Sequence, residues 1–95
     1  MAEDRRLWVF AYDIGDDVRR RRMAALLQRR AVRVQYSVFE ARLSEKAARA
    51  LARRARRWLG PGDSLRVYAV PEAALEECLA FGGAPLPADG DYLLF

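Results

Sequence analysis

Asp13 is the residue in this sequence whose type and position best suit it to chemistry. It lies near the end of the apolar run 7–14, ahead of an arginine-rich stretch and of the segment Gln35–Glu40. One carboxylate alone supplies too few functional groups for efficient catalysis. Two Asp13 carboxylates brought together by a twofold axis would repel each other unless a proton or a divalent cation lay between them. We therefore consider Asp13 as a metal ligand shared by two copies of the chain.

The metal that such a site would take is Mg²⁺, because this ion needs few protein ligands, keeps several waters and accepts phosphate oxygens. Mg²⁺ there would activate water for attack on a phosphodiester, which makes Asp13 the candidate catalytic and metal-binding residue. The sequence has no histidine and one cysteine, which excludes histidine triads, histidine metal ligands and thiolate-rich zinc sites. The alternative role for Asp13 is structural, as a cap of the following turn.

Three arginines follow Asp13 closely enough to share its site. Arg20 and Arg22 belong to a predicted helix, and Arg33 begins the next extended segment, so each is a candidate phosphate contact near the strand end. The competing interpretation is a solvated helix face, since Arg19–Arg22 cannot all point the same way.

A second group of bases lies on the next predicted helix. It forms a stripe away from the apolar face, made of Lys46, Arg49, Arg53, Arg56 and Arg57. Only Glu45 lies nearby to neutralise it, so the stripe favours a polyanionic partner, and Arg49, Arg53 and Arg56 are candidate nucleic-acid contacts. The competing interpretation is a charged face that serves solubility.

The charges divide the chain into a basic part and an acidic part. Residues 1–66 hold all 17 Lys and Arg against 8 acids, a net charge of +9, whereas residues 67–95 hold 5 acids and no base. The basic part suits a polyanion and the acidic part does not. No apolar run is long enough to span a membrane, and the N-terminus does not resemble a signal peptide, so we expect a cytoplasmic protein without membrane contact.

Apolar periodicity and turn residues predict the elements. The first half of the chain should form a strand over 7–14 buried on both faces, a helix over 18–30 with Val18 leading into its apolar stripe, and an extended segment over 33–43. This extended segment is either one strand or two strands joined near Ser37. The second half should form a helix over 45–59 capped by Ser44, a strand over 64–70, a helix over 72–81, a loop over 84–90 and a strand over 92–95. Tyr12 and Phe39 fit core or interface positions better than base-stacking positions.

This order predicts an α+β ferredoxin-like βαββαβ sandwich with an antiparallel sheet, if the extended segment is two strands. Residues 1–95 then form a single domain, with a core over about 7–70 and a C-terminal tail over about 71–95. Both helices would cover one face of the sheet and leave the other apolar face for a second copy of the protein. The apolar end of the tail, a short C-terminal strand after a C-terminal helix, predicts a role in dimerisation.

Four parts of the sequence resemble the CRISPR-associated Cas-two family, in order and in register over about residues 7–70. They are Phe10–Asp17, the helix with Arg20 and Arg22, Arg33–Glu40 and Asp63–Tyr68. The resemblance implies a ferredoxin-like fold, a homodimer, and assembly with the CRISPR integrase, the Cas-one protein, to acquire spacers from foreign DNA. Some family members are described as metal-dependent endonucleases of RNA or DNA.

The same resemblance assigns roles to individual residues. Asp13 matches the metal-binding catalytic aspartate of the family. Positions associated with that site are matched by Tyr12, Arg20, Arg22, Arg33 and Phe39.

Three functions remain open from the sequence. The first is a dimeric Mg²⁺-dependent nuclease that uses paired Asp13 residues. The second is a non-catalytic DNA-binding scaffold that bridges integrase dimers, with Asp13 in a structural role. The third, which the arginine excess disfavours, is a small regulatory ferredoxin-like domain.

Overall fold

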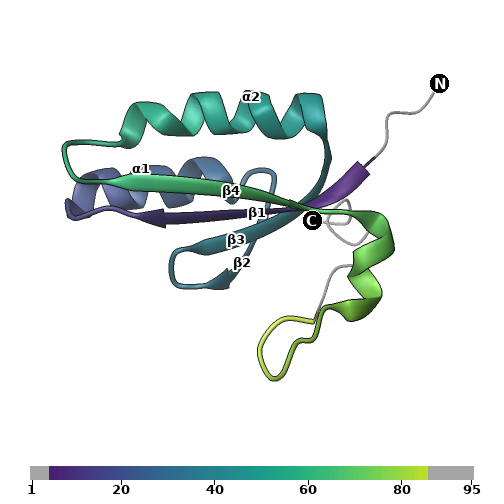
Figure 1. The fold of residues 1–95 in the computed structure, drawn as a ribbon. Coiled ribbons are helices and arrows are strands. Elements are labelled where there is room, and N and C mark those ends of the chain that lie inside the picture. The colour runs from purple at the N-terminus through teal and green to yellow at the C-terminus, as the bar shows by residue number, and fades with distance from the viewer. Residues whose placement is uncertain (1–4, 86–95) are drawn as a thin grey trace.

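The structure is a computed structural model that describes residues 5–85. The helices and strands follow in the order β1 (Arg5–Asp13), α1 (Asp17–Leu27), β2 (Val32–Gln35), β3 (Val38–Ser44), α2 (Glu45–Ala55) and β4 (Ser64–Val70) (Figure 1). Two short 3-10 segments, Arg56–Trp58 and Glu72–Glu77, follow α2 and β4. The predicted βαββαβ order is confirmed.

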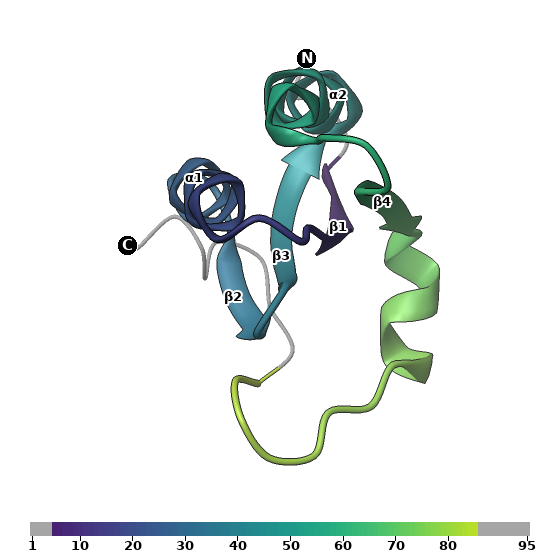
Figure 2. The same cartoon turned by 90° about the vertical axis from the view of Figure 1, so that its left-hand side faces the viewer.

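The four strands form one antiparallel sheet in the order β2-β3-β1-β4. Both helices lie on the same side of this sheet, and the chain after β4 turns to the opposite side (Figure 2). The fold is therefore the predicted ferredoxin-like α+β arrangement, in which β1 is central and β2 and β4 are the edges.

The extended segment is two strands joined by a tight turn at Tyr36 and Ser37. The Tyr12 backbone N–H donates to the Ser37 carbonyl at 3.1 Å, which ties this turn to the end of β1. The register between β2 and β3 shifts between Arg33 and Gln35, as a β-bulge does. The turn thus brings the end of β1 close to the β2–β3 hairpin.

Strand β1 is buried mainly on one face. Trp8, Phe10 and Tyr12 point into the core beneath the helices, whereas Val9 and Ala11 on the other face are only half-buried. On that second face Leu7 is buried, with 2% of its surface exposed, so the predicted burial on both faces holds at the start of the strand and is wrong from Val9 onward.

Helix α1 is shorter than predicted. It ends at Leu27, and residues 28–30 form a turn. Its apolar stripe consists of Met23, Ala24 and Leu27, which are buried, whereas Val18 is exposed and does not lead into the stripe. The helix begins where Asp16 accepts a hydrogen bond from the Arg19 N–H at 2.9 Å, a standard N-cap contact.

Helix α2 begins at the predicted cap, where the Ser44 hydroxyl accepts from the Ala47 N–H at 3.1 Å. It buries Ala48, Leu51 and Ala55 against the sheet. The α-helix stops at Ala55, and a 3-10 turn carries the chain on to Trp58, so the predicted end near residue 59 holds only if that turn is included. Small residues on the buried face let α2 pack closely on β3.

The predicted helix over 72–81 is wrong in extent and type. The segment is a 3-10 helix over Glu72–Glu77, after which the chain is irregular through Pro85. Glu72 forms an ion pair with Arg42, a base that is buried on the sheet face opposite the helices. The predicted loop over 84–90 lies largely outside the described residues, and the predicted strand over 92–95 lies wholly outside them.

No helix within residues 5–85 has the length and apolar composition needed to cross a membrane.

Phe39 anchors the core between β3 and the helices, since its side chain is 0% exposed. We expect Phe39→Ala to lower the free energy of unfolding by about 3–5 kcal/mol, because it removes a fully buried aromatic ring and leaves a cavity. Tyr36→Ala on the same hairpin is the control, since that side chain is 71% exposed and its loss should cost about 0.5 kcal/mol. Urea denaturation measures both, and equal losses would contradict the packing described.

Candidate nucleic-acid and metal site

Asp13 ends β1 opposite Ser64 of β4, and its side chain is exposed. Within residues 5–85 the Asp13 side chain makes no hydrogen bond and no ion pair. The cap of the following helix is Asp16, so the structural role considered for Asp13 is filled by another residue. The Asp13 carboxylate is therefore available to a ligand.

Asp63 holds the turn that follows Asp13. Its nearly buried carboxylate accepts from the backbone N–H groups of Gly60 at 2.8 Å and Gly15 at 3.1 Å, and from the Arg19 guanidinium at 3.0 Å. These backbone donors, together with Arg19, lower the pKa of Asp63 below its ordinary value, against a smaller opposing effect of burial. The start of β4, the start of α1 and the end of β1 are joined at this one side chain.

Gly60 lets the Arg19 side chain approach this turn closely. A Cβ at position 60 would lie 2.5 Å from Arg19 Nη2, so the guanidinium packs directly on the glycine backbone. Asp63 was within a segment that resembled the family, but no role was predicted for it. The signal that could have identified it is the Gly60–Asp63 turn, where a short acidic side chain can accept backbone hydrogen bonds.

Arg20 lies at the strand end, as predicted. Its guanidinium donates to the Ile14 carbonyl at 2.7 Å and pairs with Asp17. Burial disfavours its charge, but the Tyr36 hydroxyl and Asp17 outweigh that effect and raise the pKa of Arg20 above its ordinary value. Arg20 thus stays charged and is held at the carbonyl of Ile14, the residue after Asp13, on the helical side of the sheet, whereas the Asp13 side chain lies on the other face. Its ion pair with Asp17 already offsets part of its charge.

Arg33 lies over two aromatic rings of the same hairpin. Its guanidinium carbon is 5.1 Å from the Phe39 ring centroid and 5.8 Å from that of Tyr36, within the range of cation–π attraction. Phe39 in turn stacks on Tyr12, with ring centroids 6.2 Å apart. The Tyr12 hydroxyl is buried and has no hydrogen-bond partner within the described chain. Both aromatic residues are core residues, as expected, and they support Arg33 from below.

Arg20 and Arg33 line one hollow of about 320 Å³ between α1 and the β2–β3 turn, together with Arg21, Gln28 and Tyr36. The structure thus brings together two of the three arginines predicted to share the Asp13 end of the sheet.

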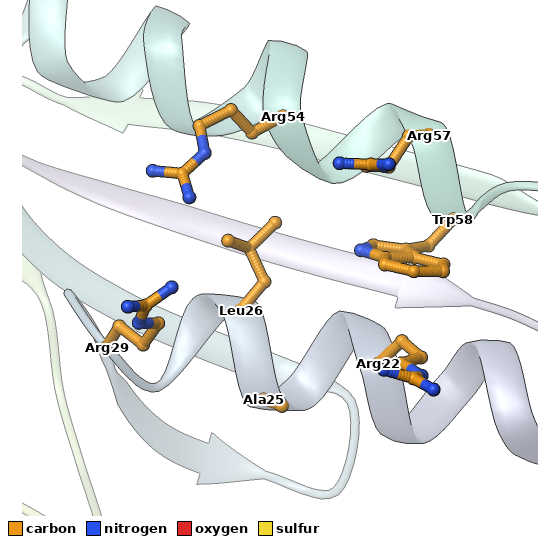
Figure 3. A pocket seen from close by; sticks show the side chains of 7 residues that line it. All are labelled: Arg22, Ala25, Leu26, Arg29, Arg54, Arg57 and Trp58. Carbon is orange, nitrogen blue, oxygen red and sulfur yellow. The ribbon is translucent and has the colours of Figure 1, made fainter.

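Arg22 lies elsewhere. Its guanidinium carbon is 5.7 Å from the ring centroid of Trp58, in a groove between α1 and α2 (Figure 3). Successive helical residues are separated by about 100°, so Arg20 and Arg22 project from nearly opposite sides of α1. The expectation that both lie near Asp13 is therefore wrong for Arg22.

The predicted contacts on α2 form a third group. Arg49, Arg53 and Arg56 are exposed on or just after the helix. Arg49 pairs with Glu45 at 2.8 Å, whereas Arg53 and Arg56 have no ion pair with any residue in the described part of the chain. The stripe is thus largely unneutralised, as the sequence indicated.

A metal site is incomplete in one protomer. Among residues 5–85, no three Cys, Asp or Glu side chains lie close enough together to hold an ion. Asp16 and Asp17 are engaged by α1, and Glu40 lies opposite Val9 on β1, four residues from Asp13 and so roughly 13 Å away along the strand. Burial also raises the pKa of Glu40. These acids do not supplement Asp13.

The fold and these residues define a ferredoxin-like α+β protein with an isolated strand-end carboxylate and arginines on both helices. A model of the family described as CRISPR associated protein Cas2 matches residues 6–78. The chain belongs to this family, the one that the sequence resembled.

Two relatives are similar over most of the chain. Identity is 42% over 91 residues with CRISPR-associated endoribonuclease Cas2 2 of Synechocystis sp., covering 92% of this chain and 96% of that protein. Identity is 50% over 84 residues with CRISPR-associated endonuclease Cas2 2 of Thermus thermophilus, covering 87% of this chain and 89% of that one.

Solved structures share the fold. A hypothetical protein from Thermus thermophilus superposes with a TM-score of 0.74 at 46% identity, over 88% of this chain and 99% of the other. A chain from a partial Cas6-RT-Cas1–Cas2 complex superposes with a TM-score of 0.70 at 23% identity, over 87% of this chain and 95% of the other, which is likeness of fold alone.

The contacts of Asp63 predict a pH-dependent contribution to stability. Because its pKa is lowered in the folded chain, the charge stabilises the fold above the ordinary carboxyl pKa of about 3.9, and this stabilisation is lost as the pH falls through the lower folded value. We expect Asp63→Asn to unfold at a lower urea concentration than the parent at pH 7, with the difference shrinking below about pH 3.9.

Glu76→Gln is the control for this measurement, since Glu76 is exposed and has no hydrogen bond or ion pair within residues 5–85. It should leave the urea midpoint at pH 7 almost unchanged. A loss in Asp63→Asn that stays constant with pH would show that the charge of Asp63 does not matter.

Proposed function

We propose that this chain acts in CRISPR adaptation as a homodimer that binds nucleic acid and assembles with the Cas1 integrase to acquire spacers. We further propose that paired Asp13 carboxylates bind Mg²⁺ and give the dimer endonuclease activity on RNA or DNA. The observation that carries the second part is the exposed Asp13 side chain, which makes no hydrogen bond or ion pair within residues 5–85 while Asp16 and Asp63 perform the nearby structural tasks.

Support for a homodimer comes from the sheet face that the helices leave uncovered. Val9, Ala11 and Val38 are half-buried there, and Tyr68 of the edge strand β4 is 52% exposed on the same face. An apolar sheet face of this kind is stabilised when a second copy covers it. Asp13 lies on that face too, so a twofold axis through it would bring two Asp13 carboxylates towards each other.

The donor set fits Mg²⁺ only in that dimer. One carboxylate from each protomer, with waters and substrate phosphate oxygens, satisfies an ion that is commonly bound by one or two carboxylates. When bound, Mg²⁺ would neutralise charge on the phosphodiester and lower the pKa of attacking water.

The chain's own side chains have separate tasks at this site. Arg20 is fixed by the Ile14 carbonyl, and Arg33 is fixed over the Phe39 ring. Because both guanidinium groups are already ordered, they lose little further mobility when they bind phosphates. Tyr12 and Phe39 position them through packing.

Support for the Cas1 partner comes from the relatives. The structural neighbour from the partial Cas6-RT-Cas1–Cas2 complex has the same fold, and the curated relatives carry CRISPR-associated nuclease names. Assembly with Cas1 is therefore the partner role that we carry over to this chain.

The second candidate function is the non-catalytic scaffold. The observation that favours it is the single available acid at this strand end in each protomer, since no cluster of metal-binding side chains is present among the described residues. In that case the arginines bind duplex DNA between integrase dimers, and Asp13 contributes nothing to cleavage.

Asp13→Asn separates these two functions. We expect it to abolish Mg²⁺-dependent cleavage of RNA and DNA, because the amide carries no charge for the ion, while sedimentation still shows a dimer, whose formation no longer depends on Mg²⁺. Spacer integration with Cas1 is measured in parallel. Cleavage that persists unchanged would show that Asp13 is not catalytic, and integration that survives without cleavage would make the scaffold the biological role.

Asp16→Asn is the matched control for this experiment. It makes the same chemical change three residues further on, and asparagine caps a helix about as well as aspartate does. Cleavage should therefore remain near the parental rate.

The α2 stripe predicts a salt-dependent affinity. Changing Arg49, Arg53 and Arg56 to Ala should weaken binding to duplex DNA and reduce the slope of log K against log salt by up to about 2.7, at about 0.9 per lost phosphate contact. Fluorescence anisotropy over a series of salt concentrations measures this slope. An unchanged slope would leave the stripe with a role in solubility alone.

A further inference from the structure

A groove of about 490 Å³ runs between α1 and α2, on the helical side of the molecule (Figure 3). Four arginines line it, one from each helix and one from the turn after each helix: Arg22 and Arg29 on the α1 side, and Arg54 and Arg57 on the α2 side. Its apolar lining is Ala25, Leu26 and Trp58. Only Arg22 of this set was predicted to bind nucleic acid, and it was expected beside Asp13.

Trp58 holds two of these cations at one end of the groove. The guanidinium carbons of Arg22 and Arg57 lie 5.7 Å and 5.2 Å from its ring centroid. Figure 3 shows Arg22 approaching the indole from α1 and Arg57 approaching it from the α2 side. Cation–π attraction fixes the two planar groups and leaves their N–H edges free for hydrogen bonds to an anion.

Arg29 and Arg54 face each other at the other end, with Leu26 beside them on the side toward Trp58 (Figure 3). Within residues 5–85 none of the four arginines forms an ion pair or a hydrogen bond to an acid. Four like charges around one groove repel each other, and an anion bound among them removes this repulsion.

A second hollow shares one arginine with the groove. Arg54 also lines a smaller cavity of about 140 Å³, where it is joined by Arg30, Leu43 and Ala47. The arginines thus extend along the helices over a greater length than one small anion would occupy. An extended ligand with regularly repeated negative charges matches this shape.

We propose that the α1–α2 groove binds the sugar–phosphate backbone of a single nucleic-acid strand, at a site separate from the Asp13 end of the sheet. The proposal rests on the nucleic-acid binding included in the proposed function and adds a second location for it. Guanidinium groups take phosphate oxygens in a bidentate manner, and the apolar floor suits the sugar edges rather than base recognition. Binding there is independent of sequence.

An acidic peptide is the competing occupant, but the groove favours a phosphate backbone. Flexible carboxylate side chains lose rotamer freedom when they are bound, whereas phosphates are part of the polymer backbone itself. The guanidinium fork also matches two phosphate oxygens directly.

The test uses the full chain labelled with 5-fluorotryptophan, whose two tryptophans give two fluorine resonances that Trp58→Phe assigns. Trp8 is buried beneath α2 and serves as the internal reference. Titration with a short single-stranded DNA oligonucleotide should shift the Trp58 resonance and leave that of Trp8 in place. Poly-glutamate and inorganic phosphate are titrated in the same way.

Two charge-matched double variants test the arginines. Arg29→Ala with Arg54→Ala should raise the dissociation constant for the oligonucleotide about tenfold or more and reduce the salt slope by about 1.4. Arg5→Ala with Arg66→Ala removes the same charge from the sheet face opposite the helices, away from the groove, and should change the constant by less than about twofold.

The outcomes that overturn the proposal differ from those that overturn the proposed function. A Trp58 resonance that stays in place while the oligonucleotide binds shows that the groove is unused, although nucleic-acid binding stands. Equal losses in the two double variants show general electrostatic attraction instead of a site. Poly-glutamate that shifts Trp58 at a lower concentration than DNA makes the groove a protein-docking site. An oligonucleotide that does not bind the parent protein at all removes the proposed function and this site together.

Discussion

The hydrogen bonds accepted by Asp63 are the interaction on which the functional end of the molecule depends. One carboxylate joins Gly15 after β1 and Arg19 on α1 to Gly60 before β4, two regions more than 40 residues apart in the sequence. With the helix capped separately by Asp16, no structural task remains for Asp13 among its described neighbours. The arrangement thereby frees an exposed carboxylate at a position that is otherwise rigid, which is what a ligand-binding group needs.

Helix geometry divides the arginines between two surfaces. The run Arg19–Arg22 occupies consecutive positions on α1, so its members point in four directions about 100° apart. Arg19 turns to Asp63, Arg20 to the strand end and Arg22 to Trp58. A single basic segment thus supplies a structural contact, a candidate phosphate contact near Asp13 and one side of the α1–α2 groove.

The sequence predicted the strand order well because local signals mark each boundary. Gly15 breaks β1, Ser44 caps α2, and Pro71 ends β4. The predictions from the sequence were wrong or incomplete where contacts between distant parts of the chain determine the position or role of a side chain. The place of Arg22 depends on Trp58, which is 36 residues away, and the role of Asp63 depends on Gly15, which is 48 residues away. The segment after Pro71 is apolar enough for a helix but packs beside Arg42 as a 3-10 turn.

Nucleic-acid binding and metal chemistry make different demands on this protein. The arginine surfaces are complete within one protomer, because each draws its cations from α1, α2 or the β2–β3 turn. The proposed metal site needs an Asp13 from each of two protomers, since one chain offers a single free acid at this strand end and no cluster of metal-binding side chains among its described residues. Two carboxylates that approach each other without a cation oppose dimer formation, whereas a bound cation would favour it. Metal binding and dimer assembly are therefore linked in the proposed mechanism. The attraction of a polyanion requires neither of them, because the arginine surfaces are already present in one protomer.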